Sequence, residues 1–128
     1  MNIFNSSAIK AIFLDLDDTL YSYPPCNKAG IDAVVHHLSK HLHREREVVA
    51  RALEHGREQA KAQLHHPDYD VAPSHSRLLY CQRAVEELVG KTDVALTLAS
   101  EKIFWDTFLD TMDLFPDAQA FLEHAKVR

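Results

Sequence analysis

The chain lacks several features that would assign it to a special class of protein. Its 128 residues include only two cysteines, Cys26 and Cys81, which give no disulfide framework and suit a reducing cytosol. No apolar run approaches the roughly 20 residues that a membrane-spanning helix needs. Residues 1–8 also lack the basic start of a secretory signal. We therefore expect a cytoplasmic protein with no membrane partner.

An excess of positive charge is also absent. The formal net charge is −5, so general binding to nucleic acids is not expected. The composition, 46% hydrophobic and 26% charged, is ordinary for a soluble globular protein. There is no internal repeat and no low-complexity tract.

One stretch, residues 11–20, organises the rest of the chain. Four apolar residues (11–14) run directly into Asp15, Asp17, Asp18 and Thr19. An apolar run of this length is typical of a strand buried on both faces, as in a parallel sheet. In open α/β sheets, ligands bind at the carboxyl ends of the strands, which is where these aspartates lie. An acidic turn is the simpler alternative, but it accounts poorly for the whole pattern.

The two carboxylates of Asp15 and Asp17 would repel each other unless a cation or hydrogen bonds compensate them. A calcium loop of the EF-hand type does not fit. Counted from Asp15, its sixth position requires Gly and its twelfth Glu, and this chain has Leu20 and Cys26 there.

The segment from Phe13 to Leu20 resembles the first motif of the haloacid dehalogenase-like (HAD) hydrolase superfamily, Asp-x-Asp-x-Thr/Val after a hydrophobic strand. The resemblance implies that Asp15 is the nucleophile and Asp17 the general acid/base. It also implies that the Asp15 carboxylate and the Asp17 backbone carbonyl bind Mg²⁺. Thr19 is a candidate substrate-binding residue that holds the loop by side-chain hydrogen bonds; a turn or helix cap is its alternative role.

This chemistry suits the residue types. A carboxylate nucleophile divides phosphate ester hydrolysis into formation and breakdown of an aspartyl-phosphate. A second carboxylic acid can protonate the leaving oxygen and then deprotonate water. Within the superfamily, dehalogenases usually lack an Asp at the position of Asp17, and transport ATPases carry Thr there. The resemblance therefore implies a phosphatase acting on a small phosphorylated metabolite, with a phosphomutase as the alternative.

Beyond residue 20, apolar residues at helical spacing predict five helices. We expect an irregular linker over residues 21–27, with Asn27 as a helix cap, and then helices over about 28–43 and 45–64. A third helix should begin near Pro73 or Ser74 and end at Gly90. A fourth should follow a cap at Thr92 or Asp93 and extend to about 114, and a fifth should begin at Pro116.

The expected fold is a HAD-like α/β Rossmann-type core, here incomplete, with an inserted all-α helical cap. The resemblance divides the chain into the first core strand and catalytic loop (1–20), the cap (21–114) and a return helix (115–128). The family's further motifs supply a Thr or Ser, a Lys or Arg, and acidic metal ligands, and we identify none of them here. We therefore expect an amino-terminal fragment that is inert alone, or else a non-catalytic interaction domain.

Two further groups of residues could bind ligands. His37 and His41 stand four residues apart, a spacing that can hold Zn²⁺, although a solvated helix face is the simpler interpretation. Arg77, near the start of the third predicted helix, could face a substrate, although a surface arginine is the simpler interpretation.

Overall fold

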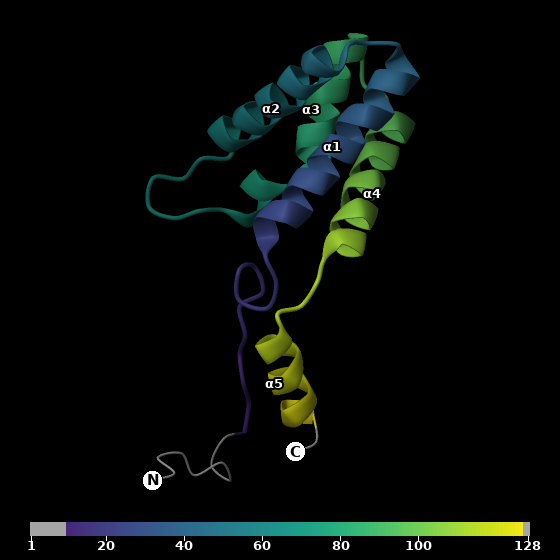
Figure 1. Cartoon of the computed structure of the whole chain (residues 1–128). Coiled ribbons are helices and arrows are strands. Elements are labelled where there is room, and N and C mark those ends of the chain that lie inside the picture. The colour runs from purple at the N-terminus through teal and green to yellow at the C-terminus, as the bar shows by residue number, and fades with distance from the viewer. Residues whose placement is uncertain (1–9, 127–128) are drawn as a thin grey trace, which may run out of the picture. The chain divides into compact units, whose positions relative to one another are not determined.

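The computed structural model describes residues 10–126 of the chain, which are mostly helical (Figure 1). They divide into two compact units, one of residues 24–111 and one that joins the segments before 24 and after 111. The elements are α1 (Tyr23–Leu42), α2 (Arg46–Gln63), the 3₁₀ helix η2 (Ala72–His75), α3 (Arg77–Val89), α4 (Val94–Thr111) and α5 (Pro116–Lys126). Within the described residues, no helix is both long and apolar enough to cross a membrane.

The unit of residues 24–111 is a helical bundle with an apolar core. Each of its four long helices turns one face inward, as the sequence pattern predicted. The core side chains include Val34 and Leu38 of α1, Val49 of α2, Ala84 and Val85 of α3, and Phe104 and Phe108 of α4. Helix α3 lies between α2 and α4 and contacts both. The expected set of amphipathic helices is therefore present.

Two glycines allow helices of this bundle to approach closely. A Cβ atom at Gly56 of α2 would lie 2.7 Å from the backbone oxygen of Tyr80 in α3. A Cβ atom at Gly30 of α1 would lie 2.7 Å from the ring of Phe104 in α4. Gly56 therefore permits a close contact between α2 and α3.

Most helix ends agree with the sequence. The Asp93 carboxylate accepts a hydrogen bond from the Leu96 N–H at 2.9 Å and caps α4. Gly90 ends α3 with a φ of 78°, in the left-handed region that favours glycine. The start of α3 is later than predicted, because Pro73 and Ser74 form the 3₁₀ turn and Ser76 is the cap.

The irregular linker predicted for residues 21–27 was wrong over most of its length. Helix α1 begins at Tyr23 and includes Pro24 and Pro25. Proline is tolerated in the first turn of a helix, where the backbone N–H has no partner within the helix. Asn27 consequently lies inside α1 and does not cap it.

The predicted strand over residues 11–14 is not formed in this structure. The side chains of Ile12, Phe13 and Leu14 are exposed, Phe13 to 96%. In the described residues, the only strand-like pairings are isolated bridges of Tyr21 with Asp17 and with Leu114. A strand needs neighbours to pair its backbone groups, and the described residues offer it none. The α/β core therefore remains an expectation, whereas the helical part is observed.

Both cysteines should be unreactive in the folded protein. Cys26 and Cys81 are each 2% exposed, and burial raises the pKa of the Cys81 thiol to about 12. Because the thiolate is the reactive form, a disulfide reagent at pH 8 should label neither residue in buffer and both in urea. Stoichiometric labelling of the native protein within minutes would contradict this packing.

Candidate functional site

The aspartate-rich segment forms a tight turn in the unit that contains α5. The N–H groups of Thr19 and Leu20 both donate to the Leu16 carbonyl, at 3.2 and 2.9 Å. Asp18 has a φ of 57°, a left-handed conformation that Asp tolerates better than most residues. The Phe115 N–H donates to the Leu20 carbonyl at 2.9 Å and attaches the turn to the segment that precedes α5.

Each of the three aspartates in the turn has its own partner. The Thr19 hydroxyl donates to Asp15 Oδ2 at 3.2 Å. The Tyr21 hydroxyl donates to Asp17 Oδ1. The Tyr23 N–H, in the first turn of α1, donates to Asp18 Oδ1 at 2.9 Å. The three carboxylates thus have different hydrogen-bond partners.

Of these contacts, the sequence anticipated one. Thr19 was expected to hold the loop through its side chain, and its bond to Asp15 does so. The contact of Tyr21 with Asp17 was missed because residues 21–27 were read as a linker. The capping of α1 by Asp18 was missed for the same reason. The sequence signal for the contact between Tyr21 and Asp17 is their separation of four residues within a tight turn.

Asp15 and Asp17 present oxygen atoms to solvent. Both residues are exposed, and the hydrogen bonds from Thr19 and Tyr21 each engage one oxygen of the carboxylate. Carboxylate and carbonyl oxygens are the ligands that Mg²⁺ prefers, and Mg²⁺ commonly uses one or two carboxylates together with waters and substrate phosphate. The donor set of the loop therefore fits Mg²⁺ in type. Among residues 10–126, no three His, Cys, Asp or Glu side chains are grouped to hold a metal.

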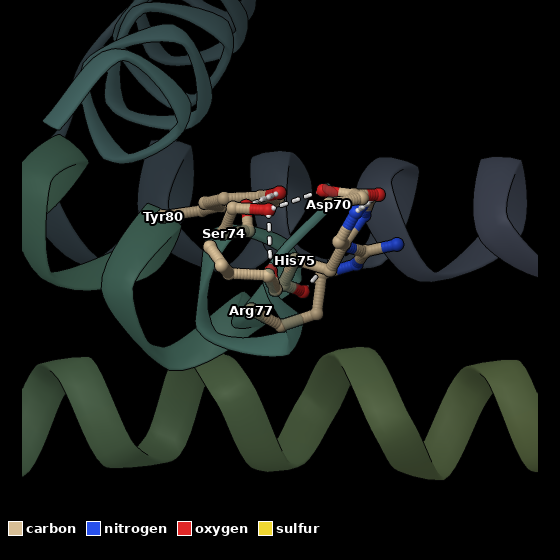
Figure 2. A network of polar contacts seen from close by, with 6 residues as sticks. Asp70, Ser74, His75, Arg77 and Tyr80 are labelled. Atoms are coloured by element: carbon tan, nitrogen blue, oxygen red, sulfur yellow. Dashed lines mark hydrogen bonds and ion pairs between the residues drawn. The ribbon is translucent and has the colours of Figure 1, made fainter. Parts of the chain in front are cut away.

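A second polar cluster lies around η2 in the helical bundle (Figure 2). The Ser74 hydroxyl contacts Asp70 Oδ1 at 3.1 Å, His75 binds the other Asp70 oxygen, and the Tyr80 hydroxyl donates to the Ser74 carbonyl at 2.6 Å. The hydrogen bond from His75, followed by that from Ser74, lowers the pKa of Asp70. The cluster keeps this carboxylate ionised and fixes the start of α3.

Arg77 is part of the bundle's own packing. Its guanidinium donates to the His75 carbonyl at 2.9 Å and to Asn27 Oδ1 at 3.1 Å. It also lies over the rings of Tyr80 and Phe104, at 5.2 and 5.0 Å from their centres. These contacts join α1, α3 and α4, which favours a structural role for Arg77 over contact with a substrate.

A cavity of about 400 Å³ opens beside this cluster. It is lined by the last turn of α2 and the segment that leads into η2: Lys61, Leu64, His65, His66, Pro67, Asp68, Tyr69, Asp70, Val71 and Ser74. The lining combines cationic, anionic and aromatic side chains, and it lies at the carboxyl end of a helix, where partial negative charge disfavours anions. The sequence identified this segment only as a break between helices.

The histidine pair of α1 does not form a metal site with the described residues. The rings of His37 and His41 are 5.9 Å apart, and no third ligand joins them there. Burial, and then the neighbouring imidazoles of His41 and His36, lower the pKa of His37. His37 is therefore held neutral by its surroundings.

The amino-acid sequence of the chain is similar to that of a known phosphatase. The chain is 36% identical over 114 residues to ribulose-1,5-bisphosphate 5-phosphatase from Halopiger xanaduensis. The match covers 88% of this chain, and the chain spans 46% of the length of that relative. No family model matches the chain, and no solved structure matches it. The chain is thus similar to part of a phosphatase over most of its length.

Proposed function

We propose that this chain carries the nucleophile loop and helical cap of a Mg²⁺-dependent phosphoric monoester hydrolase of the HAD-like superfamily. The similarity to a phosphatase over 88% of the chain is the observation that carries the proposal. The Asp-x-Asp-x-Thr turn supports it, because two exposed carboxylates lie in one tight loop with separate hydrogen-bond partners. The helical bundle of residues 24–111 is consistent with a cap inserted after the first core strand.

The proposed reaction uses Asp15 and Asp17 in sequence. A carboxylate oxygen of Asp15 attacks phosphorus, and the bond from phosphorus to the leaving oxygen breaks while Asp17 gives that oxygen a proton. Asp17 then removes a proton from water, whose oxygen attacks the aspartyl-phosphate. Inorganic phosphate leaves and the Asp15 carboxylate is regenerated. Thr19 holds Asp15 in place through the bond observed at 3.2 Å.

Mg²⁺ would be held by the Asp15 carboxylate and the Asp17 backbone carbonyl, with its other ligands from water and phosphate. When bound, it supplies positive charge that offsets repulsion between the carboxylates and an anionic substrate. An acidic chain with a net charge of −5 needs such compensation to approach a phosphate.

The proposed substrate class is a small phosphorylated metabolite. The relative's name specifies the 5-phosphate of ribulose-1,5-bisphosphate, so sugar bisphosphates are the first substrates to test. In this proposal the protein is cytoplasmic and the remaining ligands of the phosphate come from an α/β core.

Replacing Asp17 tests whether it is the general acid/base while Asp15 is the nucleophile. Asp17→Asn should lower turnover of an alkyl phosphate by about 100-fold or more, because an alkoxide leaves poorly without a proton. The attack on p-nitrophenyl phosphate, seen as release of p-nitrophenol in the first turnover, should slow much less, since this leaving group needs little protonation. The rate of leaving-group release in the first turnover, with the complete gene product, Mg²⁺ and each of the two substrates, is the measurement. Equal losses on the two substrates would refute the acid role.

Two alternative functions, a phosphomutase and a non-catalytic interaction domain, can be distinguished by experiment from a phosphatase. A phosphomutase would return the phosphoryl group to a second hydroxyl of the substrate and release little inorganic phosphate. An interaction domain without a competent site would show no turnover that Asp15→Asn removes. Release of inorganic phosphate, compared with isomerisation of the substrate, separates all three.

A further inference from the structure

Tyr21 is the most deeply buried side chain of the aspartate turn. It is 5% exposed, whereas Asp15, Asp17 and Thr19 are all exposed. Its backbone forms bridges on both sides, with Asp17 and with Leu114. The adjacent Leu20 carbonyl accepts the Phe115 N–H. The Tyr21 ring is therefore fixed by burial and by backbone pairing at the same time.

The hydroxyl of this fixed ring contacts one carboxylate of the site. It donates to Asp17 Oδ1, in a partly buried position. A carboxyl group that must give and then take a proton has to point at the reacting oxygen within hydrogen-bond reach. An exposed aspartate is otherwise free to rotate about its side-chain bonds, so a rigid donor on one oxygen orients the other.

We infer that Tyr21 is a positioning residue, whose hydroxyl holds the Asp17 carboxylate in the orientation for proton transfer. The inference rests on the proposed function, and adds to it a residue outside the Asp-x-Asp-x-Thr pattern. Tyr21 takes no proton and touches no reacting atom. Its removal should therefore affect the steps that depend on Asp17 and spare the attack by Asp15.

Tyr21→Phe keeps the buried ring and deletes only the hydroxyl. In the complete gene product with Mg²⁺, its steady-state turnover of an alkyl phosphate should fall about 10-fold. The burst of p-nitrophenol that reports attack by Asp15 should keep its rate within about twofold. In an Asp17→Asn background the same change should have little further effect, because the group that Tyr21 orients is already inactive. Tyr69→Phe, at a 61% exposed position in the helical bundle, is the matched control and should leave both rates unchanged.

The outcomes separate this inference from the proposed function. A wild-type protein whose turnover is removed by Asp15→Asn but unaffected by Tyr21→Phe would overturn the positioning role and leave the phosphatase intact. Two outcomes would show that Tyr21 has a structural role only. One is that Tyr21→Phe lowers the burst rate and the alkyl phosphate turnover equally. The other is that Tyr21→Phe has its full effect in the Asp17→Asn background. Absence of any turnover sensitive to Asp15→Asn would overturn the proposed function, and the positioning role with it.

Discussion

Asp15→Asn should remove nearly all phosphatase turnover from the gene product that contains this chain. An amide cannot form the acyl-phosphate, so the covalent route is lost and only slow uncatalysed attack remains. We expect a decrease of at least about 1,000-fold, equivalent to roughly 4 kcal/mol in the barrier. Initial rates with p-nitrophenyl phosphate and a sugar bisphosphate, each with Mg²⁺, are the measurement.

A matched control lies three residues away in the same turn. Asp18 accepts the Tyr23 N–H, and Asp18→Asn keeps a side-chain oxygen that can accept that bond. Its turnover should stay within a few-fold of wild type. Activity in Asp15→Asn above about a tenth of wild type would contradict the assignment of the nucleophile. A loss of turnover in Asp18→Asn as large as that in Asp15→Asn would show that both substitutions act by disrupting the loop. The effect of Asp15→Asn would then not identify a nucleophile.

Gly56→Ala should destabilise the helical bundle by about 2 to 3 kcal/mol. The added Cβ would lie 2.7 Å from the Tyr80 carbonyl oxygen and 3.2 Å from the Ala84 nitrogen, so α2 and α3 would have to move apart. Backbone atoms cannot rotate away as a flexible side chain can. The clash therefore outweighs the roughly 1 kcal/mol that alanine gains over glycine in helix propensity.

Thermal and urea unfolding of the chain measure this effect. The control is Ala50→Gly, at an exposed position of α2, which should cost only about 1 kcal/mol. If Gly56→Ala proved as stable as the wild type, or more stable, the close packing of α2 on α3 would be wrong.

The helices could be predicted because their causes are local. Val34 and Leu38, or Cys81 and Val85, mark a buried face by spacing alone, and Asp93 and Gly90 mark ends by capping chemistry. The start of α1 could not be predicted in the same way, because Pro24 and Pro25 lie in its first turn. Proline excludes a helix interior but not a first turn, and only the structure shows where that turn lies.

The candidate site residues are a prediction from the sequence, and their contacts could not be predicted in the same way. Asp15, Asp17 and Thr19 were identified from their order after an apolar run, yet nothing local specifies that Tyr21 would donate to Asp17. The residue that makes that contact also pairs through its backbone with Leu114, more than 90 residues later in the chain. The apolar run at 11–14 likewise indicates a strand, but a strand forms only when neighbouring strands accept its hydrogen bonds.

The central claim is that Asp15 becomes phosphorylated, and mapping the phosphoryl group tests it most directly. The gene product is mixed with Mg²⁺ and a labelled phosphate ester, quenched in acid during turnover, digested and analysed by mass spectrometry. We predict phosphate on the peptide that contains Asp15, none on that peptide in Asp15→Asn, and accumulation in Asp17→Asn, whose aspartyl-phosphate hydrolyses slowly. Phosphate on another residue, or turnover without any phosphorylated peptide in Asp17→Asn, would contradict the account.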